Sequence, residues 1–210
     1  MDNKFDELLI DYNNLRLAIN TRLNEFKQVP EDKYFYEMIY CLCTPMSKAT
    51  NALKVQEILQ SKNYHYNEIN EIDITDILRN PENYIRFHNQ KAKFIEYNKK
   101  QFDKIYKVIK KDNEPAEKRS ELVKFVKGFG YKEASHFLRN IGIFGLAILD
   151  RHILKNLVKY EIIPNNYKLK NYKDYINIET YFVNFAKMLK IEIEELDLLL
   201  WARETGEVLK

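Results

Sequence analysis

Glycine is scarce in this chain and unevenly distributed. Only five of the 210 residues are glycine, and only five are proline. Because a sheet-rich fold needs many tight turns, which glycine usually serves, this scarcity favours helices joined by short polar loops. Four of the five glycines fall within the eighteen residues from Gly128 to Gly145. Such a concentration indicates a special conformational requirement of the backbone at that place.

Apolar residues recur at helical spacing along most of the chain. Ser47 is placed to cap the helix that begins at residue 48. No repeat and no long linker interrupts the pattern, so the sequence predicts one all-α unit over residues 1–210. The helices are predicted over residues 4–27, 32–42, 48–61, 73–79, 86–111, 116–127, 131–139, 150–160, 178–189 and 192–204.

The composition excludes several classes of protein. With 45% hydrophobic and 31% charged residues, the chain is not intrinsically disordered. Two cysteines exclude a disulfide scaffold and a four-cysteine zinc or iron–sulfur site. No apolar run approaches the ~20 residues of a membrane helix, and the acidic N-terminus does not resemble a signal peptide. We therefore expect a soluble, cytoplasmic protein.

Charge is also distributed unevenly. Residues 1–85 contain 9 Lys and Arg against 14 Asp and Glu, residues 86–140 contain 15 against 7, and residues 141–210 contain 10 against 10. The middle segment, at net +8, also contains the first two clustered glycines. This segment is either a solvated lysine fringe or an electrostatic footprint for phosphates, with Lys124, Lys127 and Arg139 among its cations.

The stretch VKGFGYKEASHFLRN, residues 126–140, predicts a helix end, a G-x-G turn and a second helix. Gly128 and Gly130 allow a tight turn with positive φ. The turn points backbone N–H groups outward at a helix N-terminus, which suits a phosphate oxygen. This pattern is typical of a helix-hairpin-helix clamp on the DNA backbone, although a Schellman-capped corner between helices explains the glycines about as well.

Two further residues extend the motif. Lys132 lies two residues after Gly130, and Asp150 follows eighteen residues later at the start of a predicted helix. Residues 128–154 closely resemble the signature of the helix-hairpin-helix DNA glycosylase superfamily, and most of all its second, largely archaeal and bacterial class of 8-oxoguanine DNA glycosylase/lyase. The C-terminal stretch WARETGEVLK also resembles that class. The iron–sulfur ligands of the endonuclease III branch are absent, because no cysteine follows Cys43.

The resemblance implies a two-lobed helical glycosylase fold. One lobe would cover about residues 30–140, including the helix-hairpin-helix at 120–140. The other would combine residues 1–29 with residues 141–210.

The resemblance also implies that Lys132 and Asp150 are catalytic. A base inside a duplex must be flipped out before its sugar can be attacked. A lysine amine can then displace the base and remain as a Schiff base, from which β-elimination cuts the strand. Asp150 would stabilise the cationic sugar. Its alternative role is to cap the helix that follows, and both roles are compatible.

Other residues are implied to read the base. Trp201 would stack on the flipped base, Lys210 would bring the terminal carboxylate and its amine to the purine edge, and Phe87 would form the other side of the stack. The alternatives are core packing for Trp201 and Phe87 and a frayed chain end for Lys210. The residues expected to contact DNA are Gly128, Gly130, Lys48, His88, Asn89 and Gln90.

Together these features favour a bifunctional enzyme that excises 8-oxoguanine and then cuts the strand. It would act as a monomer on double-stranded DNA at the nucleoid, with no membrane partner. The alternatives are the same chemistry on another damaged base and a non-catalytic helix-hairpin-helix module. No histidine has a second ligand at metal spacing, so no metal is expected. The one cofactor that the resemblance allows is a monovalent cation at the hairpin.

Overall fold

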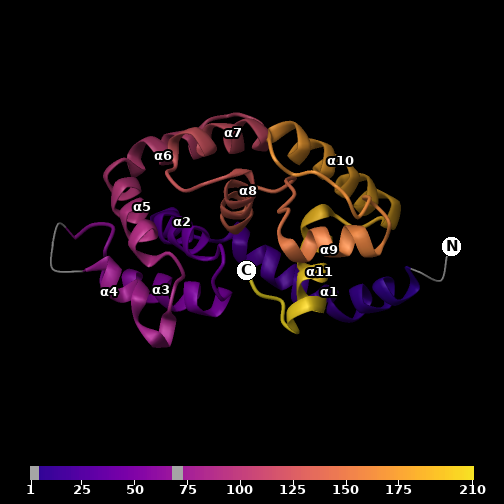
Figure 1. The fold of residues 1–210 in the computed structure, drawn as a ribbon, viewed down its shortest axis with the longest axis horizontal. Helices are drawn as coiled ribbons and strands as arrows, with labels where there is room; N and C mark the ends of the chain where they lie inside the picture. Colours follow the sequence, from indigo (N-terminus) through magenta and orange to yellow (C-terminus); the bar gives the residue numbers. More distant parts are fainter. Residues whose placement is uncertain (1–4, 68–72) are drawn as a thin grey trace. The chain divides into compact units, whose positions relative to one another are not determined.

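The computed structural model describes residues 5–67 and 73–210, and every regular element in these ranges is helical (Figure 1). This confirms the all-α prediction, whose first helix was expected to start at residue 4, outside the described ranges. No described helix is long and apolar enough to cross a membrane. In chain order the elements are α1 (Asp6–Lys27), η1 (Glu31–Lys33), α2 (Tyr34–Cys43), α3 (Ala49–Ser61), α4 (Ile74–Arg79), η2 (Pro81–Asn83), α5 (His88–Lys100), α6 (Phe102–Lys110), α7 (Pro115–Phe125), α8 (Tyr131–Asn140), α9 (Arg151–Lys159), α10 (Tyr172–Leu189) and α11 (Ile193–Thr205).

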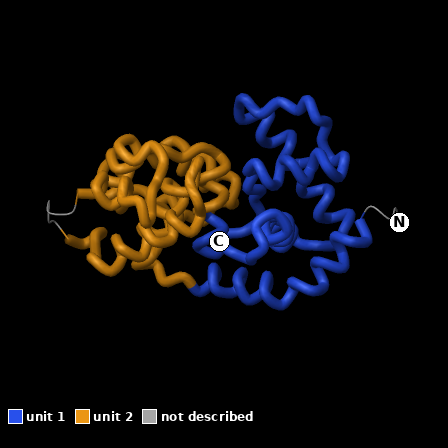
Figure 2. Tube along the Cα trace, turned by 60° about the horizontal axis from the view of Figure 1, so that its bottom comes forward, with its two compact units in different colours: residues 1–28, 138–210 blue, residues 29–137 orange. Residues whose placement is uncertain are grey.

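The helices form two compact units (Figure 2). We call residues 29–137 the central unit, and residues 1–28 together with 138–210 the terminal unit. The boundaries fall after residues 28 and 137, where the sequence predicted a division after residues 29 and 140. The chain therefore passes from the central to the terminal unit within α8.

The core of the central unit is built around α2. Every residue of this helix from Phe35 to Cys43 is buried, as expected for a helix that is apolar on nearly all sides. It packs against α3 and α5. Inside this core, the amide of Gln56 donates a hydrogen bond of 2.7 Å to the Glu37 carboxylate. This bond pairs the Gln56 amide nitrogen with the Glu37 carboxylate among apolar neighbours.

The core of the terminal unit is built around α11. This helix is buried along most of its length and packs against α1, α9 and α10. The Tyr12 hydroxyl of α1 donates to Glu195 at 2.7 Å. Gly142, at φ +80°, lies where a Cβ would be only 2.8 Å from the Lys27 backbone, so glycine is needed for this close approach. The apolar stripe of α1 consists of Leu8, Tyr12, Ile19, Leu23 and Phe26.

The single helix predicted over residues 86–111 is in fact two helices. α5 ends at Lys100, and Gln101 leaves the helical conformation at φ −122° and ψ 15° before α6 begins. Near this break, buried Asn98 donates to the Lys127 carbonyl and accepts from the Lys127 N–H, each at 2.9 Å. Gln101 donates to the Phe125 carbonyl at 3.0 Å. These bonds to a distant segment interrupt a helix whose apolar periodicity is continuous.

Two predicted helix starts also differ from the structure. α10 begins at Tyr172 rather than at residue 178, because the Asn171 side chain accepts the Asp174 N–H at 3.0 Å and caps the helix earlier. Ser47 does not cap α3, whose N-cap is Lys48 without a side-chain bond. The Ser47 hydroxyl instead accepts the Arg86 N–H at 3.0 Å. Bonds of this kind leave no trace in the spacing of apolar residues.

Candidate active site

The G-x-G turn joins α7 to α8 in the central unit. Gly128 has φ +95°, and a Cβ there would lie 2.5 Å from the Phe94 ring and 3.0 Å from Leu42. Both the backbone conformation and the available space therefore require glycine. Gly130 does not have a positive φ, so the positive φ predicted for this turn lies at Gly128. Phe129 between them is buried, with its ring centroid 5.8 Å from that of Phe137.

Lys132 lies in the first turn of α8 beside an acidic neighbour. The Glu133 carboxylate accepts the Gly130 N–H at 3.1 Å through Oε2 and pairs with the Lys132 Nζ at 3.4 Å through Oε1. The lysine side chain keeps 23% of its surface exposed. One of the N–H groups that the sequence offered to a phosphate is thus occupied by Glu133 in this structure. A Glu at the third helical position is a recognised capping signal, which the sequence analysis missed.

A second cation, Lys91 of α5, is buried near Lys132. Its ammonium donates to the Cys43 carbonyl at 2.9 Å and the Pro45 carbonyl at 2.6 Å, beyond the C-terminus of α2. A cation is favourable at this end of a helix. Burial, with a smaller contribution from the Lys132 ammonium, lowers the pKa of Lys91 to about 8. No local signal in the sequence distinguishes Lys91 from its many neighbouring lysines.

Two loops of the central unit carry the other predicted DNA contacts. Phe87 is the N-cap of α5 at φ +62° and is 53% exposed, so the alternative that it packs in the helix core is wrong. The Arg86 guanidinium lies over its ring at 5.0 Å. The loop before α3, which contains Lys48, is tied to this segment by the bond between Arg86 and Ser47.

Further contacts position the start of α5. Asn51 donates to the Tyr84 carbonyl at 3.0 Å, and the Tyr84 ring contacts the His88 ring edge-on. His88 is half-buried, whereas Asn89 and Gln90 are exposed. The structure therefore places Lys48 and residues 87–90 on neighbouring segments of one unit.

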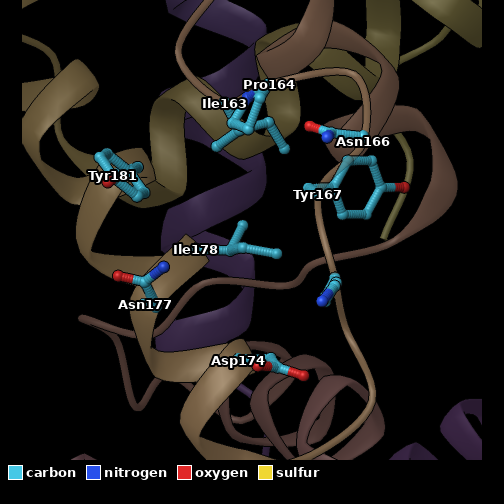
Figure 3. A pocket seen from close by; sticks show the side chains of 9 residues that line it. Ile163, Pro164, Asn166, Tyr167, Asp174, Asn177, Ile178 and Tyr181 are labelled. Atoms are coloured by element: carbon cyan, nitrogen blue, oxygen red, sulfur yellow. The ribbon is translucent and has the colours of Figure 1, made fainter.

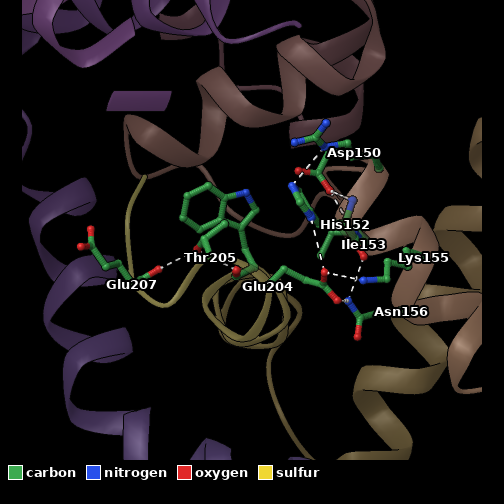
Figure 4. A network of polar contacts seen from close by, with 10 residues as sticks. Asp150, His152, Ile153, Lys155, Asn156, Glu204, Thr205 and Glu207 are labelled. Carbon is green, nitrogen blue, oxygen red and sulfur yellow. Dashed lines mark hydrogen bonds and ion pairs between the residues drawn. The ribbon is translucent and has the colours of Figure 1, made fainter. Parts of the chain in front are cut away.

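Asp150 is the N-cap of α9 in the terminal unit. Its Oδ1 atom accepts the N–H groups of His152 and Ile153, each at 2.8 Å (Figure 4). The capping role foreseen from the sequence is therefore confirmed. Because both bonds go to Oδ1, the cap leaves Oδ2 available for another task.

A buried ion pair lies within electrostatic reach of Asp150. The Arg139 guanidinium at the end of α8 pairs with the Asp197 carboxylate on α11. Burial, with smaller contributions from the Asp150 and Glu194 carboxylates, raises the pKa of Asp197 to about 7 against the opposing effect of Arg139. Arg139 is buried, so the prediction that it belongs to a surface footprint for phosphates is wrong.

Trp201 of α11 stands beside a polar network. The His152 ring contacts the indole edge-on, with centroids 6.5 Å apart. Glu204 joins the Lys155 ammonium at 2.7 Å, the Asn156 amide at 3.3 Å and His152 Nδ1 at 3.8 Å (Figure 4). The nearby Lys155 lowers the pKa of Glu204. Trp201 itself is half-buried, which is compatible both with packing and with one free face for a base.

The chain end follows a turn after α11. Gly206 has φ +88°, and Thr205 Oγ1 donates back to the Glu207 carbonyl at 3.3 Å. Residues 208–210, which include Lys210, are half-buried. This partial burial disfavours a frayed end.

The described residues also form a pocket away from the predicted site. A pocket in the terminal unit is lined by residues from 163–168 and by one side of α10, including Tyr181 (Figure 3). It contains none of the predicted site residues.

Within residues 5–67 and 73–210, no three His, Cys, Asp or Glu side chains lie close enough together to hold a metal ion.

The candidate residues are divided between the two units. Lys132, Phe87 and Lys48 belong to the central unit, whereas Asp150, Trp201 and Lys210 belong to the terminal unit. Their meeting in one active site stays a prediction.

The all-helical fold, the G-x-G hairpin with Lys132 in the next helical turn, and the capping aspartate define a helix-hairpin-helix protein of the DNA glycosylase class. A family model described as 8-oxoguanine DNA glycosylase matches residues 19–191. The chain belongs to this family.

Known proteins support the assignment over the whole length. A Fusobacterium nucleatum protein named 8-oxoguanine DNA glycosylase/AP lyase is 39% identical, with 98% of this chain and 97% of that protein covered. The structure of the 8-oxoguanine DNA glycosylase of Thermotoga maritima has a TM-score of 0.86 at 30% identity, covering 98% of each chain. A Methanocaldococcus jannaschii 8-oxoguanine glycosylase/lyase, solved with a 15mer DNA containing 8-oxoguanine, has a TM-score of 0.84 at 28% identity, covering 97% of this chain and 100% of that one.

Proposed function

We propose that this protein removes 8-oxoguanine from DNA and cuts the strand at the resulting abasic site, as a DNA glycosylase/AP lyase. One observation supports the proposal most strongly. This chain belongs to the family, and its hairpin presents a partly exposed lysine, Lys132, in the first turn of α8. A non-catalytic DNA-binding module would need the glycines of this turn but not the lysine.

Lys132 is the proposed nucleophile. After the damaged nucleotide has been flipped out, the neutral amine attacks C1′, and the base leaves with the electron pair of its glycosidic bond and takes up a proton. The sugar ring opens to a Schiff base with Lys132. Loss of a C2′ proton then breaks the C3′–O bond and cuts the strand on the 3′ side. Glu133, whose carboxylate lies 3.4 Å from the lysine amine, would accept the proton that the ammonium must lose.

Asp150 is proposed to stabilise the positive charge that develops on the sugar as the glycosidic bond breaks. Its Oδ1 is held by the cap of α9, so the carboxylate has a fixed orientation. Oδ2, which takes no part in the cap, is the atom that would face the sugar.

The remaining assignments concern the base and the DNA backbone. Trp201 and Phe87 would stack on bases, and Lys210 would read the purine edge. Lys48, His88, Asn89 and Gln90 would contact the strands, and the turn at Gly128 and Gly130 would meet a phosphate. The protein would act as a monomer at the nucleoid. The same chemistry on a different damaged base is the alternative, and comparison of several damaged duplexes tests it.

A monovalent cation is also proposed at the turn. The backbone carbonyl oxygens of the turn around Gly128 and Phe129 would hold the ion. Backbone carbonyls of this kind can replace part of an ion's hydration shell. Affinity for undamaged duplex, measured in potassium and in tetramethylammonium chloride at equal ionic strength, should be higher in potassium.

Borohydride trapping on a duplex that contains 8-oxoguanine tests the proposed chemistry. The wild-type protein should be covalently trapped, whereas Lys132→Gln should release no base and form no crosslink, because an amide cannot form a Schiff base. Lys127→Gln, which removes an exposed lysine of the same turn, is the matched control and should still be trapped. A crosslink to Lys132→Gln would show that another group is the nucleophile.

A further inference from the structure

The segment that leads to Asp150 is buried without belonging to a helix or strand. Residues 146–149 are at most 9% exposed, and they adopt no regular secondary structure. Irregular segments usually run over the surface because buried N–H groups need partners. The buried backbone N–H groups of residues 146–149 therefore need hydrogen-bond partners from elsewhere in the protein.

Side chains from two helices provide the partners. The Gly145 N–H donates to the Glu194 carboxylate on α11, and the Ala147 N–H donates to Glu179 Oε1 on α10 at 2.8 Å. The Leu149 N–H donates to the Tyr175 hydroxyl at 3.4 Å, and this hydroxyl donates to the Ala147 carbonyl at 2.7 Å. We call Tyr175, Glu179 and Glu194 the backbone ladder.

The spacing of the ladder residues on α10 matches the spacing of the N–H groups that they bind. The Ala147 and Leu149 N–H groups are two residues apart, and both donate to side chains of α10. Tyr175 and Glu179 are four residues apart and so share one face of α10. The ladder thus replaces the neighbouring strand that a sheet would supply, and its carboxylates make charge-assisted bonds, which are stronger than neutral ones.

We propose that the backbone ladder positions Asp150 for the reaction, an inference that rests on the proposed function. Asp150 follows Leu149 directly, and its own N–H donates to the Ile148 carbonyl at 2.7 Å. The cap of α9 holds the carboxylate from one side, and the ladder holds the incoming backbone from the other. Removing a rung lets the segment move, and a displacement of about 1 Å at a reacting group can cost about a hundredfold in rate.

The sharpest test compares ladder variants in two backgrounds. Tyr175→Phe removes both bonds of the middle hydroxyl while keeping the buried ring. In the wild-type background it should lower the single-turnover excision rate of 8-oxoguanine by about tenfold or more. In an Asp150→Asn background, measured with excess enzyme over long times, the same change should alter the residual rate by less than about twofold.

Two companion variants separate positioning from simple loss of structure. Glu179→Gln keeps an oxygen acceptor for the Ala147 N–H and should retain most of the excision rate, whereas Glu179→Ala should lose it as Tyr175→Phe does. Tyr181→Phe alters an exposed tyrosine of the same helix and is the matched control with an unchanged rate. Thermal unfolding of each variant shows the folded fraction, and rates are compared at a temperature where every variant is folded.

The outcomes distinguish the two proposals. Equal losses from Tyr175→Phe with and without the Asp150 carboxylate would mean that the ladder only stabilises the fold, and would overturn the positioning role. A full rate in both folded Tyr175→Phe and Glu179→Ala would overturn it as well, while leaving the proposed function intact. A wild-type protein that neither releases 8-oxoguanine nor is trapped by borohydride would overturn both.

Discussion

At the scale of single residues, the candidate site depends on groups that serve two purposes. Asp150 caps α9 with one carboxylate oxygen and keeps the other outside the cap. Glu133 accepts a backbone N–H at the start of α8 and also forms an ion pair with Lys132. Gly128 allows both the left-handed backbone and the close approach of Phe94. Conservative substitutions of these residues can therefore test the two roles separately.

Asp150→Asn should retain the fold but lose most of the excision rate. Asparagine caps helices about as well as aspartate, so the melting temperature should change little. The amide carries no negative charge to stabilise a cationic sugar, and the lost electrostatic stabilisation should cost roughly a hundredfold or more in rate. Single-turnover excision and thermal unfolding measure the two effects. An undiminished rate would leave Asp150 as a helix cap alone.

Gly128→Ala should destabilise the protein far more than Gly130→Ala. The Cβ at residue 128 would meet the Phe94 ring at 2.5 Å in a left-handed backbone, whereas the Cβ at residue 130 would meet only the carboxylate at the end of the Glu133 side chain, at 3.1 Å. Overpacking and left-handed strain together predict a loss of about 2–4 kcal/mol for Gly128→Ala. Urea unfolding measures the difference, and equal losses for the two variants would contradict this account.

At the scale of helices, charged side chains join elements at specific points. Lys91 of α5 bonds the carbonyls beyond α2, the ladder joins α10 and α11 to the approach to α9, and Arg139 joins α8 to Asp197 on α11. Buried ion pairs contribute little net stability on average.

The Arg139–Asp197 pair predicts a pH dependence of stability. The folded-state pKa of Asp197 is raised to about 7, so the folded protein binds a proton that the unfolded chain has already released above about pH 4. The free energy of unfolding should therefore fall as pH rises from about 4 to about 7, by about 1 kcal/mol per pH unit. Asp197→Asn should remove this slope. Urea unfolding at several pH values tests the prediction, and identical slopes in the two proteins would refute it.

At the scale of the whole molecule, α8 connects the two units. Its first turn carries Lys132 in the central unit, and its last residues, including Arg139, belong to the terminal unit with Asp150, Trp201 and Lys210. The proposed nucleophile, charge stabiliser and base reader thus belong to the first turn of α8, the N-cap of α9 and the C-terminal segment. Catalysis and base recognition should accordingly respond to different changes.

The chain end provides that comparison. Deleting Lys210, or extending the chain beyond it with a tag, should impair excision of 8-oxoguanine but have much less effect on cleavage at a pre-formed abasic site. The N7–H group of 8-oxoguanine can donate a hydrogen bond to a terminal carboxylate, whereas guanine presents an unpaired acceptor there, at a cost of about 1–3 kcal/mol. Kinetics on both duplexes measure the effect. Equal excision by the full-length, shortened and tagged chains would place base recognition elsewhere.

Sequence alone was sufficient for the features that depend on neighbouring residues. The helices follow from apolar periodicity, the turn from glycine at residue 128, and the cap of α9 from an aspartate before a helical pattern. Lys132 and Asp150 could be chosen as candidates because the motif and its spacing are local features of the sequence. The family resemblance supplied the activity, which spacing alone would have left open between an enzyme and a binding module.

Only the tertiary structure decided the contacts between distant segments. The break at Gln101 depends on Asn98 and Lys127, the burial of Arg139 depends on Asp197, and the support of residues 145–149 depends on side chains from α10 and α11. Periodicity records which face of a helix is apolar, but not which polar side chain will satisfy a backbone group elsewhere. That choice is made when buried N–H and carbonyl groups must find partners in the folded chain, because leaving them unpaired costs about 1–3 kcal/mol each.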